Sequence, residues 1–484
     1  MVGAGPTGLV LACDLVRRGV RTLVVEQCPA LFPGSRGKVL QPRTQEVFDD
    51  LGVMDEVRAA GGPFPAMLRW RGDRREESWE LGGGPAGEVS GTPYPSMWMI
   101  PQWRTQEILL ARLRALGGDV RFETVLTGLS QDGRGVTARL EGPGAGGGEV
   151  RAGYLVGADG GRSTVREEIG VGMRGEAVDS QPSVVADLRI SGLDREHWHV
   201  WPKAPGGPLM LCPLPGTDLF QLVARSSDGP VDVSADSVRA TIAARTPLAA
   251  ETLGEVVWAS GYRTRVALAD RYRADRVFLA GDSAHIHSPA GGQGLNTGVQ
   301  DAYNLGWKLG RVLRCGAGTA LLDSYEPERR PVAADVLGLS TRIHAVGAMS
   351  GVPGRNREET SQLDVGYPDS PLSVEARPHL LPKSLRAGDR VPDAVLDGGG
   401  RLFGLLRGPH ATLLAVGQPA PSLAAPDLAV RELPALPELG PGLFLVRPDG
   451  YLGLATSSAG DVGDYLRMIG NRHDGAGGTA SPAP

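Results

Sequence analysis

The chain begins with a glycine-rich turn between a short apolar strand and a helix. The sequence MVGAGPTGLV places Gly3, Gly5 and Gly8 in Gly-x-Gly-x-x-Gly spacing, in which glycines let a pyrophosphate approach the free N–H groups of the following helix. The next strand, VRTLVVE, ends at Glu26, where a carboxylate can accept hydrogen bonds from both hydroxyls of an unphosphorylated ribose, as in FAD or NAD. This unit predicts a Rossmann-type dinucleotide site in an α/β fold.

The strand expected before these glycines is almost missing. Only Met1 and Val2 precede the turn, although such a turn normally follows a buried strand of several apolar residues. That strand would hold a central position in a parallel sheet, where unpaired neighbours cost stability. We therefore expect either that the numbered chain begins after a further short segment or that the protein tolerates a stub strand.

Length and composition limit the classes of protein to be considered. A chain of 484 residues predicts two or three domains. No apolar stretch approaches the roughly 18 to 20 residues of a membrane span, and a net charge of -5 without a basic, aromatic-rich stripe argues against nucleic acid as a partner. The four cysteines form no Cys-x-x-Cys pair, which argues against disulfides and zinc and favours a cytoplasmic location.

A second glycine turn, GADGGRSTVR, spans residues 157–166 and follows a buried strand. It brings Asp159 close to basic and hydroxyl side chains. Taken alone, the motif fits a β-turn with a helix cap as well as it fits a ligand site.

The third glycine motif, residues 281–302, reads GDSAHIHSPAGGQGLNTGVQDA. Asp282 follows a buried strand, where it can bind a polyol hydroxyl, and Pro289–Gly294 lead into a long helix. The N-terminus of such a helix can stabilise negative charge on the edge of a reduced flavin. His285 and His287 are two residues apart in a loop with no completing carboxylate set, so we expect structural roles for them and no metal.

These three motifs, in this order and spacing, resemble the FAD-dependent aromatic hydroxylases with the para-hydroxybenzoate hydroxylase fold, above all their actinomycete polyketide-tailoring branch. The resemblance covers about residues 1–345. From about residue 378 the chain resembles the thioredoxin-like C-terminal domain of the phenol and polyketide hydroxylases, also without Cys-x-x-Cys. The implied fold is α/β: a Rossmann-type FAD-binding domain with an inserted, mainly antiparallel β-sheet substrate domain, plus a C-terminal thioredoxin-like domain.

The resemblance and the hydrophobic periodicity together predict the organisation of the chain. The predicted segments are 1–64 (first part of the FAD-binding domain, with a truncated first strand), 65–100 (a segment of the substrate domain), 101–174 (second part of the FAD-binding domain), 175–265 (substrate-binding β-sheet domain), 266–345 (third part of the FAD-binding domain, with long helices), 346–377 (linker), 378–471 (thioredoxin-like domain) and 472–484 (disordered tail). Helices are predicted over 45–61, 104–117, about 293–313 and 326–345.

The resemblance also implies an activity. It predicts a monooxygenase that uses NAD(P)H and O₂ to hydroxylate an aromatic, polycyclic polyketide-type substrate through a flavin C4a-hydroperoxide. Because the chain has no second complete Gly-x-Gly-x-x-Gly unit in a strand–turn–helix context, NAD(P)H is expected as a transient co-substrate, and the protein as a monomer or homodimer. A Baeyer–Villiger oxygenase acting on a polyketide ketone and a flavoprotein without catalytic activity remain alternatives, whereas the Trp-x-Trp-x-Ile-Pro motif of flavin-dependent halogenases is incomplete.

Residue roles follow from the resemblance at matching positions. Arg36 matches an arginine that touches the FAD pyrophosphate and assists NAD(P)H, Gln102 a glutamine near the ribityl chain, Asp159 a residue serving both cofactors, and Asp282 a ribityl ligand. Taken alone, Arg36 also fits a solvated loop residue and Gln102 an ordinary helix start. The predicted cofactor-binding residues are Gly3, Gly5, Pro6, Thr7, Gly8, Glu26, Arg36, Gln102, Asp159, Asp282, Pro289, Gly292, Gln293, Gly294, Leu295 and Asn296. Within this set, Pro289 and Gly292 are predicted to position the flavin ring for catalysis.

The inserted sheet is predicted to supply an apolar wall for a fused aromatic ring system. The candidate substrate residues are Trp201, Met210, Pro213 and Phe220. The same residues at strand spacing fit the core of any sheet equally well.

Overall fold

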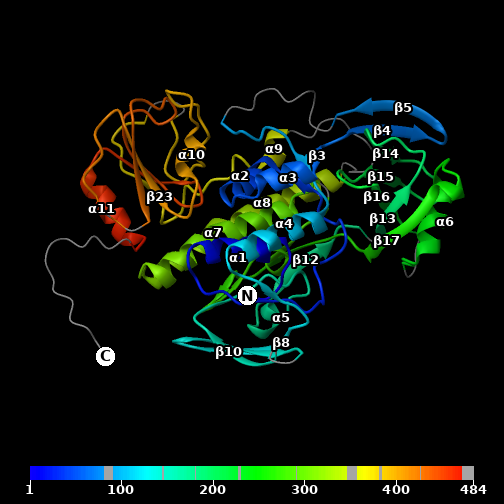
Figure 1. Ribbon diagram of the computed structural model, residues 1–484, viewed down its shortest axis with the longest axis horizontal. Coiled ribbons are helices and arrows are strands. Elements are labelled where there is room, and N and C mark those ends of the chain that lie inside the picture. Colours follow the sequence, from blue (N-terminus) through cyan, green and yellow to red (C-terminus); the bar gives the residue numbers. More distant parts are fainter. Residues whose placement is uncertain are drawn as a thin grey trace. The chain divides into compact units, whose positions relative to one another are not determined.

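The computed structural model describes residues 1–80, 91–143, 147–179, 181–226, 231–289, 291–345, 357–380, 384–423, 425 and 427–470 (Figure 1). The predicted disordered tail and residues 346–356 of the predicted linker lie outside these ranges. The chain divides into two compact units. Unit 1 comprises Met1–Val16, Arg21–Tyr303 and Arg329–Asp364, and unit 2 comprises Arg17–Val20, Asn304–Glu328 and Val365–Pro484.

A parallel sheet in unit 1 is built around the stub strand. Its strands are β1 (Val24–Val25), β7 (Val120–Arg121), β11 (Leu155–Gly157), β20 (Val277–Leu279) and the antiparallel β19 (Arg273–Ala274). Val2 joins β1 to β11, because its N–H donates to the Val156 carbonyl at 2.9 Å and its own carbonyl accepts from Ala158 at 2.8 Å. On the other side, the Gly3 N–H donates to the Val25 carbonyl at 2.8 Å. The stub is therefore paired on both sides in the centre of the sheet.

Helices flank this sheet in the order that the sequence predicts, with one correction. They are α1 (Pro6–Arg17), α2 (Pro42–Asp50), α3 (Met54–Ala60), α4 (Gln102–Ala115) and α5 (Thr164–Glu168). The single helix predicted over 45–61 is wrong, because the chain forms α2 and α3 with a break between them. Gly52 lies in the break with a φ of 71°, a left-handed conformation that ends an α-helix.

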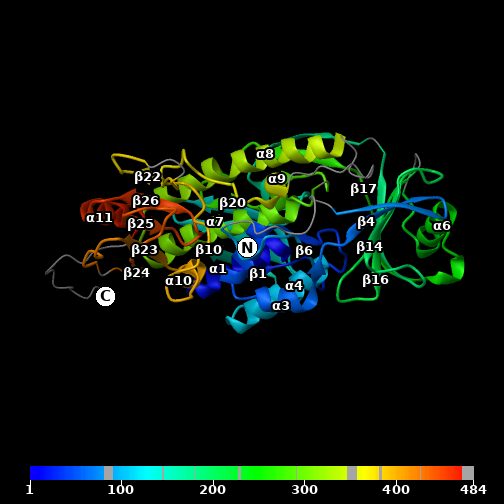
Figure 2. The same ribbon diagram turned by 90° about the horizontal axis from the view of Figure 1, so that it is seen from above.

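The inserted sheet has the strand order β17-β13-β16-β15-β14-β4-β5. The strands are β17 (Leu253–Tyr262), β13 (Ser183–Ile190), β16 (Leu219–Arg225), β15 (Leu209–Pro213), β14 (His197–Trp201), β4 (Ala66–Arg71) and β5 (Arg74–Trp79). All neighbours run antiparallel except β14 and β4, as predicted for a mainly antiparallel domain. Helix α6 (Ala235–Arg245) packs on one face through Val238 and Ile242, and Figures 1 and 2 show it alongside the sheet.

Smaller strands and long helices complete unit 1. The strands are β2 (Val39–Leu40), β6 (Trp98–Met99) and β3 (Gly62–Pro63); β8 (Val125–Asp132), β9 (Gly135–Glu141) and β10 (Gly148–Ala152); and β12 (Met173–Ala177), β18 (Arg265–Ala269) and β21 (His285–Ile286). The helices are α7 (Gly294–Arg314), α8 (Tyr325–Ala345) and α9 (Arg357–Ser361). Helices α7 and α8 lie within a residue of their predicted bounds, and the later parts of α7 and the first turn of α8 belong to unit 2.

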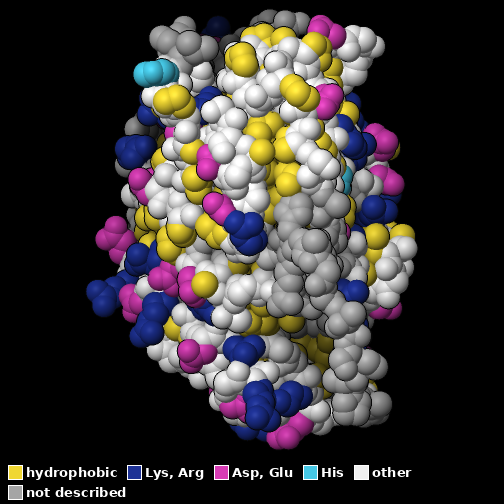
Figure 3. Space-filling view, turned by 90° about the vertical axis from the view of Figure 1, so that its left-hand side faces the viewer, with side chains coloured by type: hydrophobic (Ala, Val, Ile, Leu, Met, Phe, Trp, Pro, Cys, Tyr) yellow, Lys and Arg dark blue, Asp and Glu magenta, His cyan; other side chains and the backbone are white. Residues whose placement is uncertain are grey.

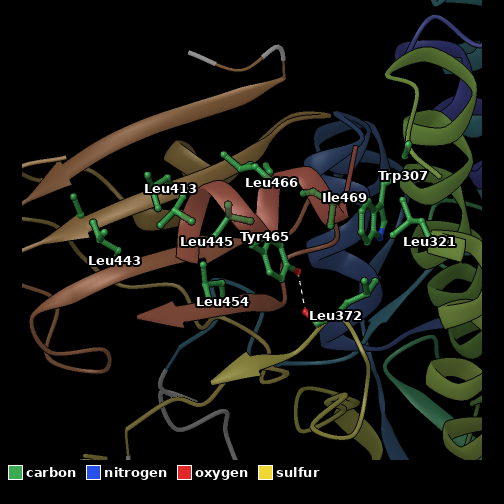
Figure 4. Packing of buried hydrophobic residues seen from close by; sticks show 14 residues of the cluster. Trp307, Leu321, Leu372, Leu413, Leu443, Leu445, Leu454, Tyr465, Leu466 and Ile469 are labelled. Atoms are coloured by element: carbon green, nitrogen blue, oxygen red, sulfur yellow. Dashed lines mark hydrogen bonds between the residues drawn. The ribbon is translucent and has the colours of Figure 1, made fainter. Parts of the chain in front are cut away.

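Unit 2 contains a mixed sheet with the strand order β22-β26-β25-β23-β24. Its strands are β22 (Val374–Glu375), β26 (Leu452–Thr456), β25 (Gly442–Val446), β23 (Ala411–Val416) and β24 (Leu428–Leu433), and its short helices are α10 (Leu402–Leu406) and α11 (Ala459–Met468). One face carries the buried cluster drawn in Figure 4, where the Tyr465 hydroxyl donates to the Leu372 carbonyl at 2.8 Å. Trp307 joins the same cluster from α7.

The described helices include none that is long and apolar enough to cross a membrane. On the face of the molecule seen in Figure 3, basic and acidic side chains are intermixed.

Candidate functional site

The three glycines of the first turn have different surroundings. Gly3 has a φ of 101°, and a Cβ atom there would overlap the Ala158 carbonyl. A Cβ at Gly8 would overlap the Gly3 carbonyl, whereas at Gly5 no described atom beyond the adjoining residues of the chain lies within 4 Å of that position. Gly3 and Gly8 are therefore required for close backbone packing, and Gly5 borders open space at the N-terminus of α1, where an anion is favoured.

Glu26 lies beside this turn at the end of β1. Its Oε2 accepts a hydrogen bond from the Ala4 N–H at 2.9 Å, and its Oε1 accepts one from the Cys28 N–H at 3.0 Å. A carboxylate oxygen can accept more than one hydrogen bond. Glu26 is therefore held in place by main-chain donors and keeps acceptor capacity for a pair of ligand hydroxyls.

Thr7 brings the first and third motifs together. A Cβ at Gly281, which has a φ of 65°, would lie 2.6 Å from the Thr7 hydroxyl, and a Cβ at Gly298 in α7 would overlap the same oxygen. Asp282 therefore follows directly on a residue that packs against the first turn of α1. The Asp282 side chain is exposed to solvent on one side. The protein atoms packed around it still desolvate the carboxylate, and this desolvation raises its pKa. Such a carboxylate suits a hydroxylated ligand chain.

Asp159 of the second motif supports the cap of α5, whose N-cap residue is Ser163. Its Oδ1 accepts from the Ser163 hydroxyl at 2.6 Å and its Oδ2 from the Val165 N–H at 3.0 Å, at the start of α5. Burial raises its pKa despite these hydrogen bonds. The cap is one of the two interpretations that the sequence leaves open, and contact of Asp159 with a cofactor stays a prediction.

Asn296 fixes the residues just before α7 through its side-chain amide. Gly292 donates to the Pro289 carbonyl at 3.1 Å. The Asn296 amide donates to the Gly292 carbonyl at 2.7 Å and to the Val39 carbonyl at 2.9 Å, while its oxygen accepts from the Gln41 N–H at 2.8 Å. Asn296 thus links the predicted flavin loop to β2, and no sequence motif pointed to Val39 or Gln41. Gln293, also predicted here, donates to the Gly291 carbonyl at 2.9 Å.

Gln102 and Arg36 meet at the segment before β2. The Gln102 Oε1 accepts from the Gly37 N–H at 2.8 Å, and a Cβ at Gly37 would lie 2.8 Å from the Leu295 side chain. The Arg36 guanidinium donates to the Ser260 hydroxyl at 2.6 Å. Partial burial lowers the pKa of Arg36, and the nearby Asp282 charge opposes that effect. Gln102 and Leu295 therefore both contact Gly37, the residue after Arg36, whereas the Arg36 guanidinium lies at Ser260.

His285 and His287 form a buried chain of polar contacts with two residues that sequence reasoning missed. The His287 Nε2 lies 2.9 Å from the His285 Nδ1, and the His285 Nε2 lies 2.5 Å from the Asp301 Oδ2. The Arg329 Nε donates to the Asp301 Oδ1 at 2.8 Å, and Gly281 donates to its Oδ2 at 3.0 Å. Although burial opposes ionisation, His285 and Arg329 lower the pKa of Asp301 to about 2. These contacts fix the third motif to α7 and α8, and a purely structural role for the two histidines stays a prediction.

The predicted substrate residues lie on opposite faces of the inserted sheet. Trp201 and Phe220 are buried in the cluster that packs against α6, and Pro213 is in register with Phe220 and shares its face. Met210 is in a separate cluster with Met67, Val200 and neighbouring aromatic rings. Of the four residues, Met210 alone lies on the face away from α6, so the four side chains do not share one face, and their contact with a substrate stays a prediction.

The fold and the site together define a class of protein: a flavoprotein in which a Rossmann-type domain carries an inserted sheet. The arrangement fits FAD, because Gly5 leaves room at a helix N-terminus, Glu26 keeps acceptor capacity and Asp282 stays accessible. These three observations concern this chain's own residues and are independent of its resemblance to other proteins.

Comparison with known proteins identifies the family. A family model described as FAD binding domain matches residues 1–340. A flavin-dependent monooxygenase of Mycobacteroides abscessus is 44% identical over 479 residues, which cover 97% of this chain and 99% of the relative. A 12-dehydrotetracycline 5-monooxygenase/anhydrotetracycline 6-monooxygenase of Streptomyces rimosus is 36% identical and covers 93% and 94% of the two chains. The chain belongs to the FAD binding domain family.

A solved structure adds to this assignment. The ternary complex of aklavinone-11 hydroxylase with FAD and aklavinone has a TM-score of 0.79 and 30% identity, covering 97% of this chain and 98% of that one. The expected relationship to the flavin-dependent aromatic hydroxylases, the expected FAD cofactor and the expected enzyme class are confirmed.

Proposed function

We propose that this protein uses NAD(P)H and O₂ to hydroxylate a polycyclic aromatic substrate of the polyketide type. The observation that carries the proposal is the convergence of the first turn, Asp282 and α7 within unit 1, where Gly281 and Gly298 both pack against Thr7. Relatives named for tetracycline and aklavinone support the substrate class. When bound, reduced FAD supplies the electrons and the activation of O₂.

The chain's own residues would hold and orient that cofactor. Gly5 and the N-terminus of α1 would take the pyrophosphate, Glu26 the ribose hydroxyls, and Asp282 the ribityl chain. The N-terminus of α7 carries a partial positive charge, which stabilises negative charge on a neighbouring ring. Asn296 would keep that helix start and β2 in a fixed relation. The protein's part in the reaction is therefore to position, to exclude water and to stabilise charge.

The experiment that tests this function is a labelled turnover. The FAD-loaded protein is incubated with ¹⁸O₂, NADPH or NADH, and anhydrotetracycline or aklavinone, and the products are examined by mass spectrometry, with ¹⁶O₂ as the control. We expect one labelled oxygen on an aromatic ring. Insertion of the label beside a ketone carbonyl would instead establish a Baeyer–Villiger oxygenase. Coenzyme oxidation that stays at its substrate-free rate across both compounds would favour a flavoprotein without this activity.

Three finer assignments belong to the same proposal. We infer that residues 378–471 are thioredoxin-like, which the mixed sheet with parallel β23 and β24 and the terminal helix α11 support. With no Cys-x-x-Cys in the sequence, its role would be structural. We also propose that the protein acts in the cytoplasm, as a monomer or homodimer.

A further inference from the structure

We propose that Lys38, Asp187 and Trp198 form a polar anchor for a hydroxyl or enol oxygen of the substrate. This inference rests on the proposed function, since it assigns the residues that would select the substrate at that same site. The name "polar anchor" refers below to these three side chains.

The polar anchor lies on the face of the inserted sheet away from α6. Asp187 of β13 is in register with Gln221 of β16, and Gln221 is in register with Cys212 of β15. Met210 and Trp198 belong to the cluster on the same face. Since residues directly opposite each other in antiparallel strands share a face, one surface of the sheet combines polar and apolar groups.

The segment that precedes β2 crosses this surface. The Ser35 N–H donates to the Asp187 Oδ2 at 2.9 Å, and the Gln221 amide donates to the Ser35 carbonyl. The Lys38 ammonium donates to the Gln221 oxygen and lies 4.4 Å from the centre of the Trp198 ring. These contacts bring groups from a loop and from the three strands β13, β14 and β16 to one place.

The same segment contacts the predicted flavin loop through its main chain. Gly37 packs against Leu295 and donates to Gln102, and the Val39 carbonyl accepts from Asn296 at 2.9 Å. In the sequence, Lys38 lies between Gly37 and Val39. The polar anchor is therefore tied on one side to the sheet and on the other to the loop that would face the flavin, which is where a substrate must lie to be oxygenated.

The polar anchor has hydrogen-bonding capacity that the protein leaves unused. Lys38 and Asp187 are 8% and 1% exposed. The Asp187 Oδ1 and the Trp198 Nε1 are buried atoms without a hydrogen-bond partner among the described residues. Buried polar atoms are nearly always paired, and a lysine ammonium has three donors. Because Lys38 uses one of its donors on Gln221, two ammonium donors, the Trp198 N–H and the Asp187 Oδ1 acceptor remain for a ligand.

These unused groups specify the chemistry of the ligand. A hydroxyl or enol oxygen can accept from Lys38 and from Trp198, and its proton can be donated to Asp187. Burial lowers the pKa of Lys38 and raises that of Asp187 to about 6. The thiol of Cys212, which faces them, is kept neutral because burial raises its pKa to about 12. The adjoining Met210 cluster favours a flat apolar ring, so the ligand combines a ring with an acidic oxygen.

The inference is tested by equilibrium dialysis of the FAD-loaded protein with 1,8-dihydroxyanthraquinone and with its dimethyl ether. We expect the dihydroxy compound to bind at least tenfold more tightly than the ether. Trp198→Phe and Lys38→Met are expected to abolish most of that preference. The matched control is Trp201→Phe, on the same strand and opposite face, where the indole donates to the Gly72 carbonyl at 3.2 Å; it should leave the preference unchanged.

The following outcomes would decide whether the polar anchor binds the substrate oxygen. Unchanged preference in Trp198→Phe and Lys38→Met, or a wild-type protein that binds both compounds equally or neither, would overturn the polar anchor. If Lys38→Met fails to retain FAD, Trp198→Phe alone decides, because it keeps an aromatic ring and removes one donor. Selective binding of the dihydroxy compound without oxygenation in the labelled turnover would count against the proposed function while supporting the polar anchor.

Discussion

At the scale of single residues, the glycines of the first turn separate folding from cofactor binding. Gly8 has no room for a side chain because a Cβ would overlap the Gly3 carbonyl, whereas at Gly5 no described atom beyond the adjoining residues of the chain lies within 4 Å of the Cβ position. The two glycines look equivalent in the sequence motif, yet their substitutions should have different consequences.

We predict that Gly8→Ala destabilises the apoprotein by about 1–3 kcal/mol, since overpacking forces the backbone to shift. Gly5→Ala should change the apoprotein's stability by less than about 0.5 kcal/mol, but it should weaken FAD at least tenfold because its methyl group occupies the space left for the pyrophosphate. Urea unfolding of the apoproteins and titration with FAD measure the two effects. Wild-type FAD affinity in Gly5→Ala would place the pyrophosphate elsewhere.

At the scale of elements, the sequence predicts glycine motifs more reliably than it predicts the face of a sheet on which a side chain lies. The Gly3–Gly8 turn and the end of β1 were predictable because positive φ angles, close backbone approach and a strand-terminal carboxylate restrict the residue types that can occur there. The face of the sheet on which Trp201 lies was not predictable, because both faces of that sheet are covered and strands such as β15 are buried throughout. Alternation, the usual signal of strand orientation, is then absent.

Long-range polar contacts were also beyond the sequence. Asp301 lies sixteen residues after His285 and Arg329 a further helix away, and their contacts depend on how α7 and α8 pack. Likewise, the break between α2 and α3 depends on Gly52 taking a left-handed conformation, which hydrophobic periodicity over 45–61 does not register.

The Asp301 contacts lead to a prediction about pH. The pKa of Asp301 is about 2 in the folded chain against 3.8 for the free group. The folded state therefore binds fewer protons in this range, and the stabilisation is complete above pH 4 and is lost as pH falls toward 2. We expect it to be worth about 2 kcal/mol. Asp301→Asn should remove this part of the acid-unfolding profile.

Asp301→Asn should also lower the free energy of unfolding at neutral pH by about 3–5 kcal/mol, because it removes a buried charged partner of Arg329. Urea unfolding between pH 2.5 and 7 measures both effects. As a control, Asp132 makes an exposed ion pair with Arg151, so Asp132→Asn should cost no more than about 1 kcal/mol. Equal acid profiles in wild type and Asp301→Asn would contradict the role assigned to this carboxylate.

At the scale of the whole molecule, the residues assigned to FAD all belong to unit 1, while unit 2 has its own buried charge cluster. The Glu328 carboxylate accepts from Arg447 at 2.7 and 2.9 Å and from Lys308 at 2.7 Å. Although burial opposes it, these two cations hold the pKa of Glu328 well below its usual range. Stability and cofactor affinity should therefore respond to different substitutions.

We predict that Glu328→Gln lowers the free energy of unfolding of unit 2 by about 3–5 kcal/mol, because Arg447 and Lys308 lose their shared buried counter-charge. The dissociation constant of FAD should stay within twofold of wild type, because Glu328 lies outside the unit that contains Gly5, Glu26 and Asp282. Conversely, FAD at a hundred times its dissociation constant should stabilise unit 1 by about 2.7 kcal/mol. Calorimetry of apo and FAD-loaded forms of both proteins measures these shifts. A loss of FAD affinity that matches the loss of stability would mean that the charge cluster of unit 2 supports the cofactor site. It would contradict the conclusion that stability and FAD affinity respond to different substitutions.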